Sequence, residues 1–218
     1  MKTFYEEFID KNIKYKNYDF KDAKFDIKIA RDNLLLFKQI CDKYEVKFFL
    51  LFGTLLGAVR ENNFIKYDTD VDVGILETER KKLQNATPEL LENGFKIVRN
   101  YKSPIQDIDD LVTFMKNGVY IDIGIFDIRG GYYMYQNNKV PIKFLDKLEK
   151  IEFLGNSFFV PNHYIKYLEY NYGKSWKVPI KDEPANPFFK RYYFRFARWS
   201  KDNFIGKILR KIKRVLVG

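Results

Sequence analysis

Three aspartates occupy alternate positions, at Asp68, Asp70 and Asp72, where an apolar stretch over 71–76 begins. Alternate residues of an extended chain point to the same face, so Asp70 and Asp72 are expected to project together from a strand. Neighbouring carboxylates repel one another unless a cation offsets their charge, and hard oxygen ligands favour Mg²⁺ or Mn²⁺. The alternative is a solvent-exposed strand edge with alternating acids. Because the other residues of this strand are apolar, a central position and a metal site are favoured.

A second apolar stretch, 119–127, carries Asp122 between two isoleucines and Asp127 near its end. If this stretch lies beside the first, Asp122 completes a three-carboxylate cluster that could hold two metal ions. Asp122 could also accept the proton of an attacking hydroxyl group. Three further acids fall in a loop-like stretch and are expected to be solvated: Asp107, Asp109 and Asp110.

Gly53 and Thr54 stand between an apolar run over 47–52 and a short helical segment over 54–60. Glycine lets a ligand approach the backbone, threonine offers a hydroxyl, and the first turn of a helix has free N–H groups. Such pairs are also common in ordinary strand-to-helix turns. Their proximity to the aspartates favours a phosphate-binding role.

The composition narrows the class of protein. The chain has 218 residues, 46% of them hydrophobic, which indicates a globular fold. A single cysteine (Cys41) excludes an internal disulfide framework, and with one histidine a Cys/His zinc site is not expected. The longest nearly apolar run, 48–59, is shorter than the roughly 20 residues of a spanning helix. We expect a cytoplasmic protein, soluble or peripheral on the inner face of the cytoplasmic membrane.

The basic charge is concentrated in residues 188–218, which hold ten basic side chains and one acidic one, whereas the whole chain has a net charge of +10. Within 189–204 and 206–217, apolar residues share one helical face and lysines and arginines the other. This pattern predicts a basic amphipathic helical tail that binds an anionic membrane surface. The alternative is a helix that packs on the body with its cationic side solvated. We expect a catalytic domain over 1–187 and a tail over 188–218.

Hydrophobic periodicity and turn signals predict an α/β (α+β) fold, a small mixed sheet flanked by helices. The first 25 residues are expected to form an arm or a partial helix. A helix over 77–93 is expected to break near Pro88. The other expected helices are 27–44, 54–60 and 163–172, and the expected strands are 47–52, 71–76, 95–101, 111–116, 119–127, 150–154 and 157–160.

Three ordered blocks, within 53–72, 121–127 and 161–179, resemble the signature of the LicD/fukutin family. The first reads GTLLGAVR, then Phe64-Ile65 and the three aspartates. The second has Gly124-Ile125 where Phe-Pro is usual, and the third contains the pattern Y-G-x-x-W-x-x-P. The resemblance covers about residues 27–180 and implies a nucleotidyltransferase-like fold.

The resemblance also implies roles for individual residues. Asp70 and Asp72 would bind the metal on the donor's diphosphate, and Asp122 would be a further metal ligand that assists the acceptor. Gly53 and Thr54 would hold phosphate, and Arg60 would stabilise the transferred charge. Apart from the resemblance, Asp68 at the mouth of the first strand and Asp127 near the end of the second are expected to lie toward the substrate.

The activity that this resemblance implies is transfer of a phospho-alcohol from a CDP-activated donor such as CDP-choline, CDP-ribitol or CDP-glycerol. The acceptor would be a hydroxyl of a cell-surface glycan or its lipid-linked precursor, as in capsule or lipopolysaccharide modification. One alternative is a nucleotidyltransferase that uses an NTP and a small molecule or RNA end; the small body argues against a nucleic-acid partner. Another is a non-catalytic membrane-associated module.

Overall fold

The computed structural model describes residues 4–9, 25–102, 109–136 and 138–179. The chain divides into two compact units, Met1–Tyr167 and Leu168–Gly218. The first unit contains the sheet and every predicted site residue. The predicted domain boundary at 187 and the basic tail lie outside the described residues.

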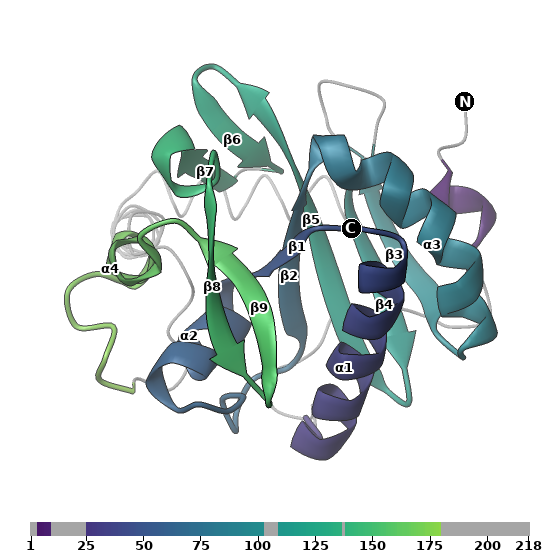
Figure 1. Cartoon of the computed structure of the whole chain (residues 1–218), viewed down its shortest axis with the longest axis horizontal. Coiled ribbons are helices and arrows are strands. Elements are labelled where there is room, and N and C mark those ends of the chain that lie inside the picture. The colour runs from purple at the N-terminus through teal and green to yellow at the C-terminus, as the bar shows by residue number, and fades with distance from the viewer. Residues whose placement is uncertain (1–3, 10–24, 103–108, 137, 180–218) are drawn as a thin grey trace, which may run out of the picture. The chain divides into compact units, whose positions relative to one another are not determined.

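The first unit is built on a nine-stranded mixed sheet with the main order β3-β4-β5-β2-β1-β9-β8, to which β6 and β7 are added at β5 (Figure 1). β2 runs parallel to β5, and β1 runs parallel to β9, while the remaining pairs are antiparallel. The prediction of a small mixed sheet flanked by helices is confirmed. The strands are β1 Phe48–Leu50, β2 Val71–Leu76, β3 Lys96–Lys102, β4 Asp109–Lys116, β5 Val119–Arg129, β6 Tyr132–Tyr135, β7 Asn138–Pro141, β8 Leu148–Phe153 and β9 Asn156–Pro161.

Two of the helices, α1 and α3, lie on the same side of the sheet (Figure 1). The Asp26 carboxylate caps α1 by accepting hydrogen bonds from the amides of Lys28 and Ile29. The α-helices are α1 Ile27–Lys43, α2 Phe52–Arg60, α3 Arg80–Glu92 and α4 Tyr164–Tyr172, and the 3₁₀ turns are η1 Tyr5–Glu7, η2 Glu77–Glu79 and η3 Ile142–Phe144. Among the described residues, no helix is both long enough and apolar enough to cross a membrane.

The two faces of the central strands differ in chemistry. Val71, Val73 and Ile75 of β2 are buried. Phe37 of α1 packs against Phe48, the partner of Ile75 in β1, with ring centroids 5.2 Å apart. This face is therefore the core under α1. Side chains alternate along a strand, so the acids of β2 project from the opposite face.

The expectation that the helix breaks near Pro88 is wrong. Pro88 lies inside α3, which continues to Glu92. Proline removes one helical hydrogen bond, but Leu83, Ala86 and Leu90 on both sides of it are fully buried. Their burial holds both halves of the helix against the core.

The β6–β7 hairpin was not predicted, and the expectation that Asp110 is solvated is wrong. β4 begins at Asp109, and Asp110 is only 1% exposed. One oxygen of Asp110 accepts a hydrogen bond from Arg129 Nη2 at 2.9 Å, and the other accepts from the amide of Gln136 at 3.1 Å. A buried carboxylate needs such partners, and these two lie at the base and the turn of the hairpin.

Candidate active site

Parallel pairing of β2 with β5 places Asp72 directly beside Asp122. Asp70 precedes Asp72 by two residues on the same face, as its spacing predicts. One carboxylate oxygen from each of Asp70, Asp72 and Asp122 lies within 4.8 Å of the others. We call these three residues the acidic cluster. All three side chains are half-buried, so the cluster is sheltered and still reachable.

Asp122 is held by two residues that were not predicted as site residues. Thr113 of β4, its cross-strand partner, donates its hydroxyl to Asp122 Oδ1 at 2.6 Å. Arg99 of β3 donates to Asp122 Oδ2 and, through Nε, to Thr113 Oγ1 at 2.9 Å. Arg99, Thr113, Asp122 and Asp72 thus form one row across four neighbouring strands. The row fixes the orientation of the Asp122 carboxylate.

Burial and mutual repulsion disfavour the charged form of the acids. Burial, followed by the charges of Asp122 and Asp68, raises the pKa of Asp70 to about 7. Burial and the charge of Asp70 raise the pKa of Asp72 well above its usual value, although a backbone hydrogen bond from Gly53 acts in the opposite direction. Burial raises the pKa of Asp68 to about 6. A cation bound at this position would offset the repulsion among all of these carboxylates.

Asp68 lies against Gly53, at the edge of the cluster. Its Oδ1 accepts a hydrogen bond from the amide of Thr69 at 3.1 Å, whereas the buried Oδ2 has no hydrogen-bond partner among the described residues. A Cβ atom added to Gly53 would overlap the Asp68 carboxylate. Glycine at position 53 is therefore required for the close approach of this fourth acid.

These observations support the fit of a metal ion. Three carboxylate oxygens can converge on one cation, and the fourth carboxylate beside them has a buried oxygen without a hydrogen-bond partner in the described part of the chain. Hard divalent cations favour carboxylate oxygens of this kind. The acidic cluster could therefore hold a metal ion.

Gly53 and Thr54 lie in the first turn of α2, because the helix begins at Phe52 and not at residue 54 as predicted. Thr54 is fully buried, and its Oγ1 accepts a hydrogen bond from the amide of Asp72 at 2.8 Å. In this structure the threonine ties the start of α2 to the strand that carries the acids. Its contact with phosphate remains a prediction.

The other two predicted site residues lie on different elements. Arg60 is the last residue of α2, and its guanidinium forms an ion pair with Glu61 at 2.6 Å. Asp127 lies five positions after Asp122 on β5, so alternation directs it to the opposite face. Asp127 Oδ1 accepts a hydrogen bond from the amide of Ile128 at 2.8 Å. The structure thus gathers Asp68, Asp70, Asp72 and Asp122 but does not bring Asp127 into the group.

Replacement of Gly53 by alanine is expected to lower divalent-metal affinity about tenfold, since the new methyl group forces the Asp68 carboxylate out of place. Alanine favours a helix over glycine, so the secondary structure of α2 is expected to persist. Manganese binding followed by electron paramagnetic resonance measures the effect.

The matched control for this substitution is a double-mutant cycle with Asp68→Ala, which removes the carboxylate that the methyl group meets. In the Asp68→Ala background, Gly53→Ala is expected to change manganese affinity by less than about twofold. An equal loss in both backgrounds would show that the overlap with Asp68 is not the cause.

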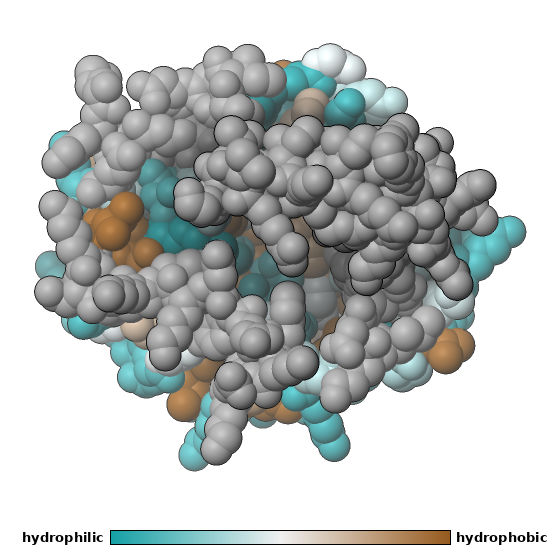
Figure 2. All heavy atoms as spheres, turned by 180° about the vertical axis from the view of Figure 1, so that it is seen from behind, coloured by the Kyte–Doolittle hydropathy of each residue, from teal (hydrophilic) through white to brown (hydrophobic). Residues whose placement is uncertain are grey.

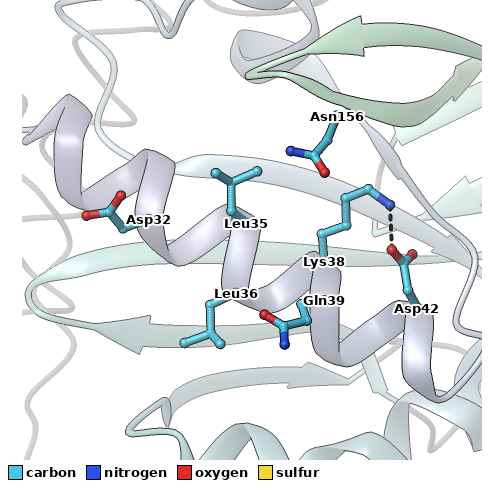
Figure 3. A pocket seen from close by; sticks show the side chains of 7 residues that line it. All are labelled: Asp32, Leu35, Leu36, Lys38, Gln39, Asp42 and Asn156. Carbon is cyan, nitrogen blue, oxygen red and sulfur yellow. Dashed lines mark hydrogen bonds and ion pairs between the residues drawn. The ribbon is translucent and has the colours of Figure 1, made fainter.

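A hollow of about 520 Å³ lies elsewhere, along the outer side of α1 (Figure 3). Asn156 of the β8–β9 hairpin faces it, and the Lys38–Asp42 ion pair, at 2.7 Å, spans part of it. It contains no residue of the acidic cluster. In Figure 2, which is viewed from the side opposite to that of Figure 1, hydrophilic side chains (teal) are visible among the described residues.

A mixed sheet with paired aspartates on one strand and a third aspartate on the adjacent parallel strand defines a domain of the nucleotidyltransferase type. Residues 45–163 match the model of the family described as LicD/FKTN/FKRP, nucleotidyltransferase domain. The chain belongs to this family.

Named relatives agree with this assignment. The chain is 30% identical over 191 residues to ribitol-5-phosphate transferase FKTN of Mus musculus, a match that covers 83% of this chain and 38% of that protein. It is 29% identical over 103 residues to lipopolysaccharide cholinephosphotransferase LicD of Haemophilus influenzae, with 42% of this chain and 39% of that protein covered. The chain therefore spans well under half the length of these relatives.

A solved structure is also similar in outline. The solution structure of the antibiotic-resistance factor ANT(2'')-Ia matches with a TM-score of 0.48 and 11% identity, over 88% of this chain and 95% of that one.

Proposed function

We propose that this protein transfers a phospho-alcohol group from a CDP-activated donor to a hydroxyl of a cell-surface glycan or its lipid-linked precursor. The observation that carries the proposal is the acidic cluster on β2 and β5, within a LicD/FKTN/FKRP domain. Relatives with this domain carry names that specify ribitol-phosphate and phosphocholine transfer. The alcohol on the donor would thus be ribitol or choline, and glycerol is kept as a third candidate.

Asp70, Asp72 and Asp122 would hold Mg²⁺ or Mn²⁺, which when bound neutralises charge on the donor's diphosphate. Gly53 and Thr54 would hold phosphate at the first turn of α2, where the Thr54 amide would donate to a phosphate oxygen while the Gly53 amide donates to Asp72. Arg60 would stabilise the charge on the transferred group, and Asp68 would lie on the substrate side of the cluster. A role for Asp127 in substrate binding stays a prediction, since alternation places it on the opposite face of β5.

Asp122 would accept the proton of the acceptor hydroxyl as that oxygen attacks the phosphorus that carries the alcohol. The new bond joins the acceptor oxygen to this phosphorus, the bond to the bridging diphosphate oxygen breaks, and CMP leaves. Arg99 and Thr113 each donate to a different oxygen of Asp122. A carboxylate oxygen has two lone pairs, so each retains one for the proton or the metal.

The test is release of CMP from CDP-choline, CDP-ribitol and CDP-glycerol, in the presence of Mg²⁺ and an acceptor glycan preparation. We expect one of these donors to yield CMP in a reaction that requires both acceptor and metal. No CMP from any of the three would overturn the proposal. Pyrophosphate from an NTP would indicate the alternative nucleotidyl transfer.

Residues 188–218 are proposed to bring the enzyme to an anionic membrane surface, where lipid-linked precursors lie. Each basic residue near such a surface contributes on the order of 1 kcal/mol, so a net charge of +9 gives tight, salt-sensitive binding. Wild-type protein is expected to sediment with vesicles that contain 30% phosphatidylserine by composition, and a chain that ends at Pro187 is expected to stay in solution. Vesicles of phosphatidylcholine alone are the control, and equal sedimentation of both chains would contradict the proposal.

A further inference from the structure

Two paired glycines lie beside the acidic cluster, on the same face of the sheet. Gly74 of β2 and Gly124 of β5 are partners in the parallel pairing, two residues beyond Asp72 and Asp122. A Cβ atom at Gly124 would lie only 3.3 Å from ring carbons of Tyr135. The absence of a side chain at position 124 therefore lets the Tyr135 ring rest on the sheet next to the carboxylates.

Tyr135 is the last residue of β6, and three contacts hold it in place. Its ring packs against Phe126 and Phe52, with centroid separations of 4.9 and 6.2 Å. The amide of the next residue, Gln136, donates to the buried carboxylate of Asp110. The unexpected burial of Asp110 thus serves to fix the end of β6 over the site.

The Tyr135 hydroxyl lies within the electrostatic influence of the acids. Burial, followed by the charges of Asp72 and Asp122, raises the pKa of Tyr135 well above its usual value. A tyrosine hydroxyl, with an ordinary pKa of about 10, carries its proton at neutral pH and is therefore a hydrogen-bond donor there without any shift.

A cation bound to the carboxylates can hold an anionic ligand. A phenolic hydroxyl beside the same carboxylates can then donate a hydrogen bond to that ligand. We propose that the Tyr135 hydroxyl donates a hydrogen bond to a phosphoryl oxygen of the substrate at the acidic cluster. Tyr135 is then a substrate-binding residue supplied by the β6–β7 hairpin, a part of the fold that carries none of the acids. This inference rests on the proposed function only in that both place a phosphate group at this cluster.

The test measures binding without turnover, with pyrophosphate and Mn²⁺ as the probe in isothermal titration calorimetry. Tyr135→Phe keeps the ring and removes only the hydroxyl. We expect its affinity for pyrophosphate in saturating Mn²⁺ to fall about tenfold, since a hydrogen bond to a charged group is lost. Its affinity for Mn²⁺ alone is expected to stay within about twofold of wild type, because the phenol is not a ligand of hard cations here. The matched control is Tyr132→Phe on the same strand, where the side chain is exposed, and this variant is expected to bind both as wild type does.

Equal pyrophosphate affinity in wild type and Tyr135→Phe, or no binding to wild type, would overturn the inference. If Tyr135→Phe does not fold, Gly124→Ala serves instead, because its methyl group displaces the Tyr135 ring by a few tenths of an ångström. A loss of pyrophosphate affinity in that variant with unchanged Mn²⁺ affinity supports the proposal, and unchanged affinity for both overturns it. A tenfold loss of pyrophosphate affinity in Tyr135→Phe, together with no CMP release from any CDP-linked donor, would support the inference and overturn the proposed function.

Discussion

The Asp70→Asn/Asp72→Asn double variant is expected to lose Mn²⁺ binding and to carry out the proposed transfer at least about a thousandfold more slowly than wild type. Both side chains belong to the acidic cluster, whose oxygens lie within 4.8 Å of each other. Asparagine keeps the size of the side chain but contributes no negative charge, so the cation loses most of its attraction. Equilibrium dialysis with Mn²⁺ and the CMP-release assay measure the two effects.

Asp32→Asn is the matched control for this double variant, because Asp32 is exposed on α1 and lies on the other side of the sheet. The control is expected to bind Mn²⁺ and to release CMP as wild type does. Equal Mn²⁺ binding in wild type and the double variant would show that the acidic cluster is not the metal site.

The metal-free protein is expected to become less stable as the pH rises from about 4 to above 7. The pKa of Asp70 is raised from 3.8 to about 7, and that of Asp68 from 3.8 to about 6. Between these limits the folded chain binds more protons than the unfolded chain, so the free energy of unfolding falls with rising pH. A divalent cation replaces the protons above this window, and its stabilising effect is expected to grow with pH.

The measurement compares melting temperatures of wild type and the Asp70→Asn/Asp72→Asn variant in a chelator. The variant lacks two of the repelling charges, so at pH 8 it is expected to melt about 5 °C above wild type, whereas at pH 5 the difference shrinks. Added Mn²⁺ is expected to raise the melting temperature of wild type at pH 8 and to leave the variant unchanged. A difference between the two proteins that does not depend on pH would contradict the assigned shifts.

Most of the elements of the fold could be predicted from periodicity, because the strands and helices near the acids have clear apolar faces. The β6–β7 hairpin lacks such alternation, since its residues are mostly half-exposed. Gly130-Gly131, the turn that joins β5 to β6, was an available hairpin signal. The expectation of a helix break at Pro88 was wrong because packing of buried neighbours overrides a local helix-breaking preference.

The acidic cluster could be predicted because alternation places Asp70 and Asp72 on one face and a second strand of matching character carries Asp122. Thr113 could have been found as well. A two-residue turn at Asn117-Gly118 fixes the register of β4 and β5, and counting back from it sets Thr113 opposite Asp122. Arg99 could not be found in this way, because the pairing of β3 with β4 shifts register between Ile97 and Arg99. No count along the sequence anticipates such an irregularity.

The parallel bridge between Ile9 and Ile97 bears on how this domain should be delimited. β3 is at one end of the strand order, and residues at the N-terminus pair with its outer edge, where Tyr5 is fully buried. An uncovered edge strand is a template for association between molecules. The family match begins only at residue 45, after both this segment and α1. A domain that keeps this edge covered therefore begins before residue 45, and its first residues protect the strand whose Arg99 orients Asp122.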